Sequence, residues 1–355
     1  LAALCLGALA ALAAGADPFA YQWEQLAPGV WAGVRDPFEL PQEGNAVFVV
    51  MRAGVVVFDA GGSPAMGEAI VAQVRAVTDL PVTHVVISHW HGDHMRGLQA
   101  IRAAFPQAAV LAHPHTRQWI EQTRDRWLKR RVSMVPNIRK ALDAALAAGQ
   151  DLAGRPLIPE EKAWLEQGLA NTARLDEENR RTDYVVPEGA IEDELVLRAG
   201  RREIRFFHPG DAHTAGDLIM WLPRERIVAT GDVVTTPVPL MPSSYTGSYV
   251  AVLERIRALG FAALVPGHGA VQRDGRAIDL LEALVRGVGS QMHALVGQGL
   301  GEEAAIGGID YSGLEAPFTH GDPFLEHRFQ DYVAGAELAR AAWRAENGEV
   351  PEEPF

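Results

Sequence analysis

One segment of this chain concentrates residue types that bind metal ions: Ser88-His89-Trp90-His91-Gly92-Asp93-His94. Three imidazoles and one carboxylate fall within six residues, directly after an apolar run that predicts a buried strand from Val82 to Ser88. A loop at a strand end can aim alternate side chains at one point. His89 and His91 are therefore expected to bind one ion, and Asp93 and His94 a second. The alternative, a chance cluster in a polar turn, fits poorly with four such ligands in six positions.

Three further candidate ligands lie far along the chain, each just past an apolar run. They are His213 within Pro209–Asp217, Asp232 after Ala229-Thr230-Gly231, and His268 within Pro266–Gly269. Taken singly, each is a weak candidate, because a lone histidine is more often a structural hydrogen-bonding group and an aspartate after glycine is more often a turn residue. Their shared place after strand ends, with small flanking residues that allow close backbone approach, favours a common site.

Strands and helices alternate through most of the chain. The first part is β-like from Tyr21 to Asp59, and Ser63-Pro64 then offers a helix cap followed by proline at the first helical position. A second β-rich part runs from Glu194 to Val234. A helix from about Ser248 to Leu259, a strand from Ala262 to Val265 and two helical stretches within 277–346, at about Ala277–Val296 and Phe324–Glu346, complete the prediction.

Residues 114–183 break this alternation. Helices are predicted at Thr116 to about Arg131, Ile138 to Ala148 and Pro159 to about Arg180, with no strand between them. Three consecutive helices indicate an insertion into the α/β body. Because the insertion follows a strand end, we expect it near the mouth of the metal site, where it could form a lid or a wall. A dimer interface is the other role that the sequence leaves open for it.

Composition restricts the compartment and the partners. The net charge of -13 over 355 residues does not suit a nucleic-acid partner, because phosphate binding needs clustered Lys and Arg. Residues 1–16 are almost wholly Ala and Leu and resemble a signal peptide with cleavage near Ala16. We therefore expect a periplasmic or secreted protein whose catalytic domain spans 17–355, with no stable membrane insertion after cleavage. Its oligomeric state is not predicted.

The single cysteine, Cys5, lies within that leader. The mature chain would then contain no thiol, so neither a disulfide nor a thiolate ligand is available to it. Any metal site must be built from histidine and carboxylates. Structural zinc sites usually use cysteine, whereas catalytic sites leave a coordination position for water, so this composition favours a catalytic site.

The order His-x-His-x-Asp-His, followed by His213, Asp232 and His268, resembles the metallo-β-lactamase superfamily. The resemblance implies an α/β fold, a four-layer αβ/βα sandwich, here with a helical insertion. It also implies that Asp232 bridges two zinc ions opposite a bridging water or hydroxide, and that Asp59 in Asp59-Ala60-Gly61-Gly62 supports the ligands. Fe or Mn could replace zinc. By the same resemblance the first ion is held by His89, His91 and His213, and the second by Asp93, His94 and His268.

Hydrolysis is the reaction that this resemblance implies. A metal-bridging hydroxide would cleave an ester, lactone, thioester or related bond of a small molecule, with Asp93 and Asp232 as catalytic carboxylates. The fold also carries phosphodiesterases and sulfatases, so it does not determine the substrate. A dedicated metallo-β-lactamase is the main alternative; the two-zinc β-lactamases have Cys or Ser where this chain has Asp232, and a bridging Asp is typical of the broader hydrolases.

Two hypotheses from other functional classes are also open. An iron-dependent oxidoreductase of the same fold is one, although His91 and the full two-metal ligand set argue against a mononuclear iron enzyme. An exported binding protein without catalysis is the other, and the intact ligand positions argue against it.

Substrate contacts are predicted less sharply than ligands. Ser243, Ser244 and Tyr245 could reach the site from the Pro-containing loop after Asp232. Among the tryptophans of the insertion, packing onto the body is favoured over lining an apolar pocket; these are Trp119, Trp127 and Trp164.

Overall fold

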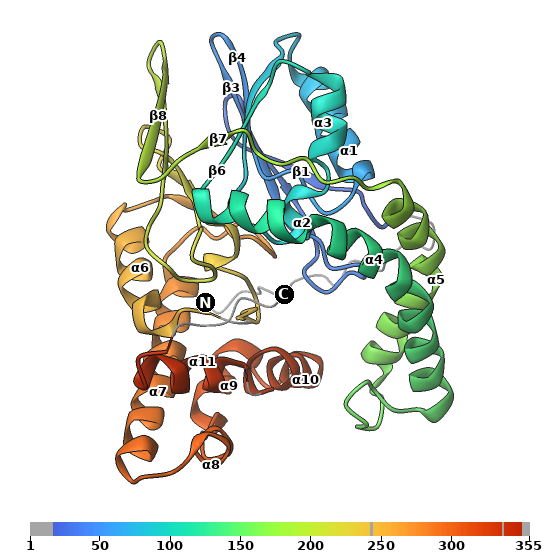
Figure 1. Ribbon diagram of the computed structural model, residues 1–355, viewed down its shortest axis with the longest axis vertical. Helices are drawn as coiled ribbons and strands as arrows, with labels where there is room; N and C mark the ends of the chain where they lie inside the picture. Colours follow the sequence, from blue (N-terminus) through green and yellow to red (C-terminus); the bar gives the residue numbers. More distant parts are fainter. Residues whose placement is uncertain (1–16, 242–243, 336, 350–355) are drawn as a thin grey trace, which may run out of the picture.

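The computed structural model describes residues 17–241, 244–335 and 337–349 and contains two β-sheets (Figure 1). The predicted leader at 1–16 lies outside the described residues. None of the helices in the described part has the length and apolarity needed to cross a membrane.

The first sheet has seven strands in the order β1-β2-β3-β4-β5-β6-β7. The first four form an antiparallel meander, and the last three are added in parallel. The parallel part places the carboxyl ends of β4 and β5 at the same edge, which is where the metal-binding segment begins. The strands are β1 (Gln22–Ala27), β2 (Val30–Val34), β3 (Ala46–Met51), β4 (Gly54–Phe58), β5 (Val82–Val86), β6 (Ala109–Ala112) and β7 (Gly189–Ala190).

The second sheet has five strands in the order β12-β11-β10-β9-β8. β11 and β12 are parallel and the other pairs are antiparallel, so the carboxyl ends of β11 and β12 also share one edge. The strands are β8 (Glu194–Ala199), β9 (Arg202–Phe207), β10 (Ile219–Leu222), β11 (Ile227–Ala229) and β12 (Ala263–Val265).

The two sheets pack face to face, with helices on their outer faces. The core between the sheets joins side chains of both, as in the Phe58–Phe206 pair with ring centroids 6.0 Å apart. α1 (Pro64–Val77) and α3 (Leu98–Ala104) cover the first sheet, and α6 (Thr246–Ala258) and α7 (Arg276–Gly297) cover the second. The result is the expected four-layer αβ/βα sandwich.

The expected helical insertion is present between β6 and β7, but as two helices, not three. α4 (Pro114–Ala148) runs unbroken through Pro136, and α5 (Pro159–Arg181) packs beside it (Figure 1). A proline inside a helix removes one hydrogen bond and costs about 3 kcal/mol. Burial of Leu142 and Ala145 against Leu165 of α5 offsets that cost, so the predicted break between Arg131 and Ile138 does not occur.

The C-terminal part also differs from the two predicted helices. After α7 come α8 (Glu302–Gly307) and α9 (Ser312–Thr319), which were not predicted. The predicted helix Phe324–Glu346 is divided into α10 (Pro323–Phe329), a π-helical turn η2 (Gln330–Ala334) and α11 (Glu337–Glu346). Gly335 follows the π-helical turn directly, and glycine is the weakest helix former after proline.

Candidate metal centre

The seven predicted ligands gather at the edge where the carboxyl ends of strands from both sheets meet. β5 leads into α2 (Gly92–Met95) and supplies the ligands of the 89–94 segment. β11 leads into the 3-10 turn η1 (Gly231–Val233), which carries Asp232, and β12 leads to His268. His213 comes from the loop between β9 and β10. Residues far apart in the sequence thus meet because parallel strands end at one edge.

Two groups of four side chains share Asp232. The first consists of His89, His91, His213 and Asp232, and the second of Asp93, His94, Asp232 and His268. Within each group, one ligand atom of every residue lies within 4.8 Å of those of the others. This division between two groups is the one that the resemblance implies.

Distances between donor atoms are those of ligands around a common cation. In the first group, His213 Nε2 lies 3.0 Å from His91 Nδ1 and 3.6 Å from Asp232 Oδ2. In the second, His268 Nε2 lies 3.1 Å from Asp93 Oδ2, and His94 Nε2 lies 3.1 Å from Asp232 Oδ1.

Charge and burial at the cluster fit divalent cations. Burial lowers the pKa of His213 to about 3, so this imidazole is neutral and its nitrogen can act as a ligand. Burial opposes ionisation of Asp232, but His268 and His94 hold the pKa of its carboxyl well below the usual range. His89 Nε2 is buried without a hydrogen-bond partner, and Asp232 Oδ1, although 3.1 Å from His94 Nε2, accepts no well-directed hydrogen bond. Ionised carboxylates and unpartnered donor atoms in one buried cluster are what a bound cation would satisfy.

Asp59 orients two of the imidazoles, as its predicted supporting role requires. Its Oδ2 lies 2.9 Å from His94 Nδ1 and accepts a 2.8 Å hydrogen bond from Ser88 Oγ. Ser88 Oγ in turn lies 2.9 Å from His89 Nδ1. With the Nδ1 atoms engaged in this way, the Nε2 atoms of both histidines are left to face the cluster. Asp59 holds φ at 61°, a rare conformation for a non-glycine residue, which these bonds maintain.

Two glycines are required by the close packing around the ligands, a role that the sequence alone did not assign. A Cβ at Gly267 would lie 1.9 Å from Asp232 Oδ1, and one at Gly44 would lie 2.4 Å from the His94 ring. Both positions therefore need glycine for steric reasons, and any side chain there would displace a ligand.

Comparison with known proteins agrees with this geometry. A family model for the metallo-β-lactamase superfamily matches residues 41–268. The chain belongs to the metallo-β-lactamase superfamily. Its members are metal-dependent hydrolases.

Curated relatives match this chain over only part of their own length. A linear primary-alkylsulfatase from Pseudomonas sp. (strain ATCC 19151) is 25% identical over 226 residues, which cover 61% of the chain and 39% of the relative. A type 2 metallo-β-lactamase from Bacillus sp. (strain 170) is 28% identical over 129 residues, covering 34% of the chain and 49% of the relative. The chain thus spans less than half the length of either relative.

Solved structures support the fold. A metallo-β-lactamase from Pontibacter korlensis matches with a TM-score of 0.51 at 15% identity, covering 75% of the chain and 99% of that structure. A stereoselective inverting sec-alkylsulfatase from Pseudomonas sp. matches with a TM-score of 0.59 at 12% identity, covering 91% of the chain and 50% of that structure. At these identities the likeness concerns the fold alone.

The loop that carries His213 in this superfamily member is held by Asp217, a residue that the sequence did not single out. Thr214 donates to Asp217 from its backbone N at 3.0 Å and from Oγ1 at 2.7 Å. Burial raises the pKa of the Asp217 carboxyl to about 7, against the effect of these bonds. The short separation between Asp217 and Thr214 was the available clue.

The predicted substrate contacts have different outcomes. Ser243 lies outside the described residues. Ser244 is fully buried, and its Oγ has no hydrogen-bond partner. The backbone N of Tyr245 donates to Ala212 O at 2.7 Å, beside His213. Contact between these residues and a substrate stays a prediction.

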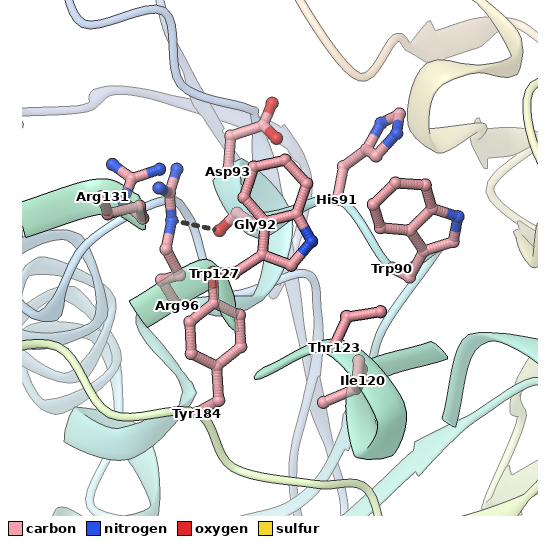
Figure 2. Close-up of a pocket in the computed structure, with 10 residues that line it drawn as sticks. All are labelled: Trp90, His91, Gly92, Asp93, Arg96, Ile120, Thr123, Trp127, Arg131 and Tyr184. Atoms are coloured by element: carbon pink, nitrogen blue, oxygen red, sulfur yellow. Dashed lines mark hydrogen bonds between the residues drawn. The ribbon is translucent and has the colours of Figure 1, made fainter. Parts of the chain in front are cut away.

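A cavity of about 240 Å³ opens beside the two metal groups, between the 89–94 segment and α4 (Figure 2). Among the three tryptophans of the insertion, Trp127 lines it, Trp119 is buried behind it, and Trp164 packs against Phe324. The expectation that these tryptophans pack against other side chains is therefore right for Trp119 and Trp164, whereas Trp127 lines the cavity. The lining residues are Trp90, His91, Gly92, Asp93, Arg96, Ile120, Thr123, Trp127, Arg131 and Tyr184.

Proposed function

We propose that this chain is an exported binuclear zinc hydrolase that cleaves an ester, lactone, thioester or related bond of a small molecule. One observation carries the proposal: two complete groups of imidazole and carboxylate ligands share Asp232 in a buried cluster. Such a pair of groups suits two ions held close together, a common arrangement in hydrolases. Export is supported by the composition of residues 1–16.

Each ion would have its own set of ligands. His89, His91 and His213 would hold the first, Asp93, His94 and His268 the second, and Asp232 would contact both. Bound zinc would supply Lewis-acid polarisation of the scissile bond and activation of water near neutral pH. Mn or Fe could occupy the same imidazole and carboxylate ligands.

The two carboxylates are placed for different tasks. The side chain of Asp232 is 4% exposed and lies between the imidazoles, where it balances the charge of both groups. The side chain of Asp93 is 23% exposed and lines the cavity, so a substrate in the cavity would reach it. We infer that Asp93, the ligand at the edge of the cavity, orients the reacting groups, whereas Asp232 holds the two ligand groups together during the reaction.

Sulfate esters are a second candidate substrate class. The match to the linear primary-alkylsulfatase extends over 61% of the chain, more than the 34% matched by the type 2 metallo-β-lactamase. Both relatives are under 30% identical to this chain. Sulfate esters and the ester-type substrates named above are therefore compared by experiment.

The deciding experiment combines metal analysis with a substrate panel. The mature chain is purified without added metal, analysed, loaded with zinc and assayed against chromogenic esters, lactones, thioesters, β-lactams, phosphodiesters and sulfate esters. We expect two zinc equivalents and turnover of at least one ester-type class. One equivalent of iron with no zinc would instead favour an oxidoreductase, and tight zinc binding without any turnover would favour a binding protein.

A further inference from the structure

Two guanidinium groups line the cavity beside the metal centre. Arg96 follows α2, and Arg131 belongs to α4 of the insertion (Figure 2). Asp93 is the one carboxylate among the lining residues, and its Oδ2 lies 3.1 Å from His268 Nε2, toward the metal cluster. The cavity lining therefore carries two guanidinium groups and one carboxylate, and that carboxylate is directed toward the metal cluster.

Arg96 is buried and held in one orientation. The residue is 3% exposed; its Nε donates to Gly92 O at 2.7 Å, and its Nη2 donates to Glu43 Oε2 at 3.1 Å. Its Nη1 is buried and has no hydrogen-bond partner. An unpartnered charged donor is unfavourable in a buried position, and an acceptor that enters the cavity would relieve that cost.

Arg131 is held by a contact with α5. Its Nε donates to Asn179 Oδ1 of α5 at 2.9 Å, so the packing of the two insertion helices sets its direction. No carboxylate of the described chain lies within ion-pair distance of Arg131. Its terminal nitrogens therefore keep their charge for a ligand.

The remaining walls are largely apolar. Ile120, Trp127 and Tyr184 line the cavity together with Trp90, whose ring stacks on the buried Trp119 at 4.7 Å between centroids and 13° between planes. A cavity of about 150 Å³ is enough for benzene, so about 240 Å³ accommodates an aromatic ring or a short acyl chain together with an acidic group.

We propose that this cavity recognises an oxyanion, a carboxylate or a sulfate, carried on an apolar body of the substrate. Arg96 and Arg131 would bind the oxyanion, and the aromatic walls would bind the body. Because His91 and Asp93 line the same cavity, a molecule seated there lies next to the metal groups. The inference rests on the proposed function for the reaction, but binding of the anion can be measured without turnover.

The first test measures binding to the zinc-loaded full chain by tryptophan fluorescence, since Trp90 and Trp127 line the cavity. Phenylacetate and phenyl sulfate are compared with neutral phenylacetamide. We expect at least one anion to bind about tenfold or more tightly than the amide. The tighter of the two anions identifies carboxylate or sulfate as the recognised group. Equal affinity for all three probes would overturn the proposal, whatever the substrate panel shows.

Variants on α4 separate the cavity from direct binding to zinc. Arg131→Met should remove most of the preference for the anion, whereas Arg124→Met, an exposed position of the same helix outside the cavity, should keep it. If Arg131→Met retains the full preference, the anion binds elsewhere and the proposal is wrong.

Arg96 needs a paired design, because removing it alone leaves Glu43 buried without its partner. Glu43→Gln is therefore compared with Glu43→Gln/Arg96→Met. The double variant should bind the anion about tenfold more weakly than the single variant. Equal binding by the two would remove Arg96 from the recognition site, and circular dichroism of both checks that they fold.

Discussion

The metal centre and a second cluster of similar residues, Asp151, Glu161 and His327, look alike as sets of donors but differ in charge balance. Both bring imidazole and carboxylate atoms within 4.8 Å of one another. In the second cluster, Glu161 Oε1 accepts from Arg328 Nη2 at 3.1 Å and from His327 Nδ1 at 2.8 Å, and Asp151 pairs with Arg155. In the metal centre, Asp93 and Asp232 form ion pairs with imidazoles alone among the described residues.

The comparison teaches that donor proximity alone does not make a cation site. Guanidinium groups already neutralise the carboxylates of the second cluster, so a divalent ion there would have to displace arginine. At the metal centre, the ion-pair partners that the described residues offer to Asp93 and Asp232 are imidazoles, and a metal ion can replace the protons that charge them. The second cluster joins the insertion to α10, which is a structural task.

The largest effect should come from Asp232→Asn, which removes a negative charge from both ligand groups at once. We expect turnover to fall to background and zinc content to fall below two per chain, measured by steady-state assay and elemental analysis, with secondary structure retained. Asp151→Asn is the matched control in the second cluster and should leave zinc content unchanged. Near-normal turnover in Asp232→Asn would exclude its bridging role.

Glu161→Gln should lower stability and leave the zinc content unchanged, the reverse of the effect expected for Asp232→Asn. Its side chain is fully buried against Arg328, whose side chain is 4% exposed, and breaking a buried pair costs about 3–5 kcal/mol. We expect about 3 kcal/mol less unfolding free energy in urea, because Asp331 still pairs with Arg328 at 3.1 Å. Zinc content should stay at two per chain; its loss would mean that the second cluster also binds metal.

Asp59→Asn tests the support of the ligands. An amide in place of the carboxylate would present a donor to Ser88 N or to His94 Nδ1, which disturbs the orientation of both imidazoles. Loss of such a supporting group typically costs 10–100-fold in metal affinity. Competition titration with a chelator measures this change; an unaltered zinc affinity would show that Asp59 only stabilises its turn.

Asp331→Asn should have the smallest effect. This carboxylate is 28% exposed and pairs with Arg155 and Arg328 at the rim of the second cluster. Partly exposed ion pairs contribute about 0–1 kcal/mol, so the urea midpoint should move little and zinc affinity should not change. A loss as large as that of Glu161→Gln would show that the network acts as one unit.

The alternation of strands and helices and the candidate ligands at strand ends could be predicted because local patterns place them, whereas the four-layer sandwich and the division of the ligands between two ions followed from the resemblance to the superfamily. Each ligand segment directly follows an apolar strand, and parallel strands bring such ends together. The unbroken α4 could not be predicted, since the contacts with Leu165 that compensate for Pro136 come from another helix. The second cluster was also invisible, because Glu161 and His327 lie 166 positions apart and meet only through tertiary packing.

The residues that line the cavity also could not be predicted, because tertiary packing brings them together. Arg96 stands two residues after the ligand motif, but its burial depends on the pairing with Glu43. Arg131 reaches the cavity because the two helices of the insertion pack together beside it. Sequence patterns mark the ends of strands well. They do not mark which side chains of a long helix face a site on another element.

The sharing of ligands between the two halves of the chain has a consequence for kinetic stability. His91 and His213 are 122 positions apart, and each ligand group takes residues from both halves. An ion bound by such a group would act as a reversible cross-link that closes a long loop and restricts the unfolded chain, as a disulfide does in other proteins. With a single cysteine, this chain cannot form an internal disulfide. Metal loading would then control how long the folded enzyme resists proteolysis, as well as whether it reacts.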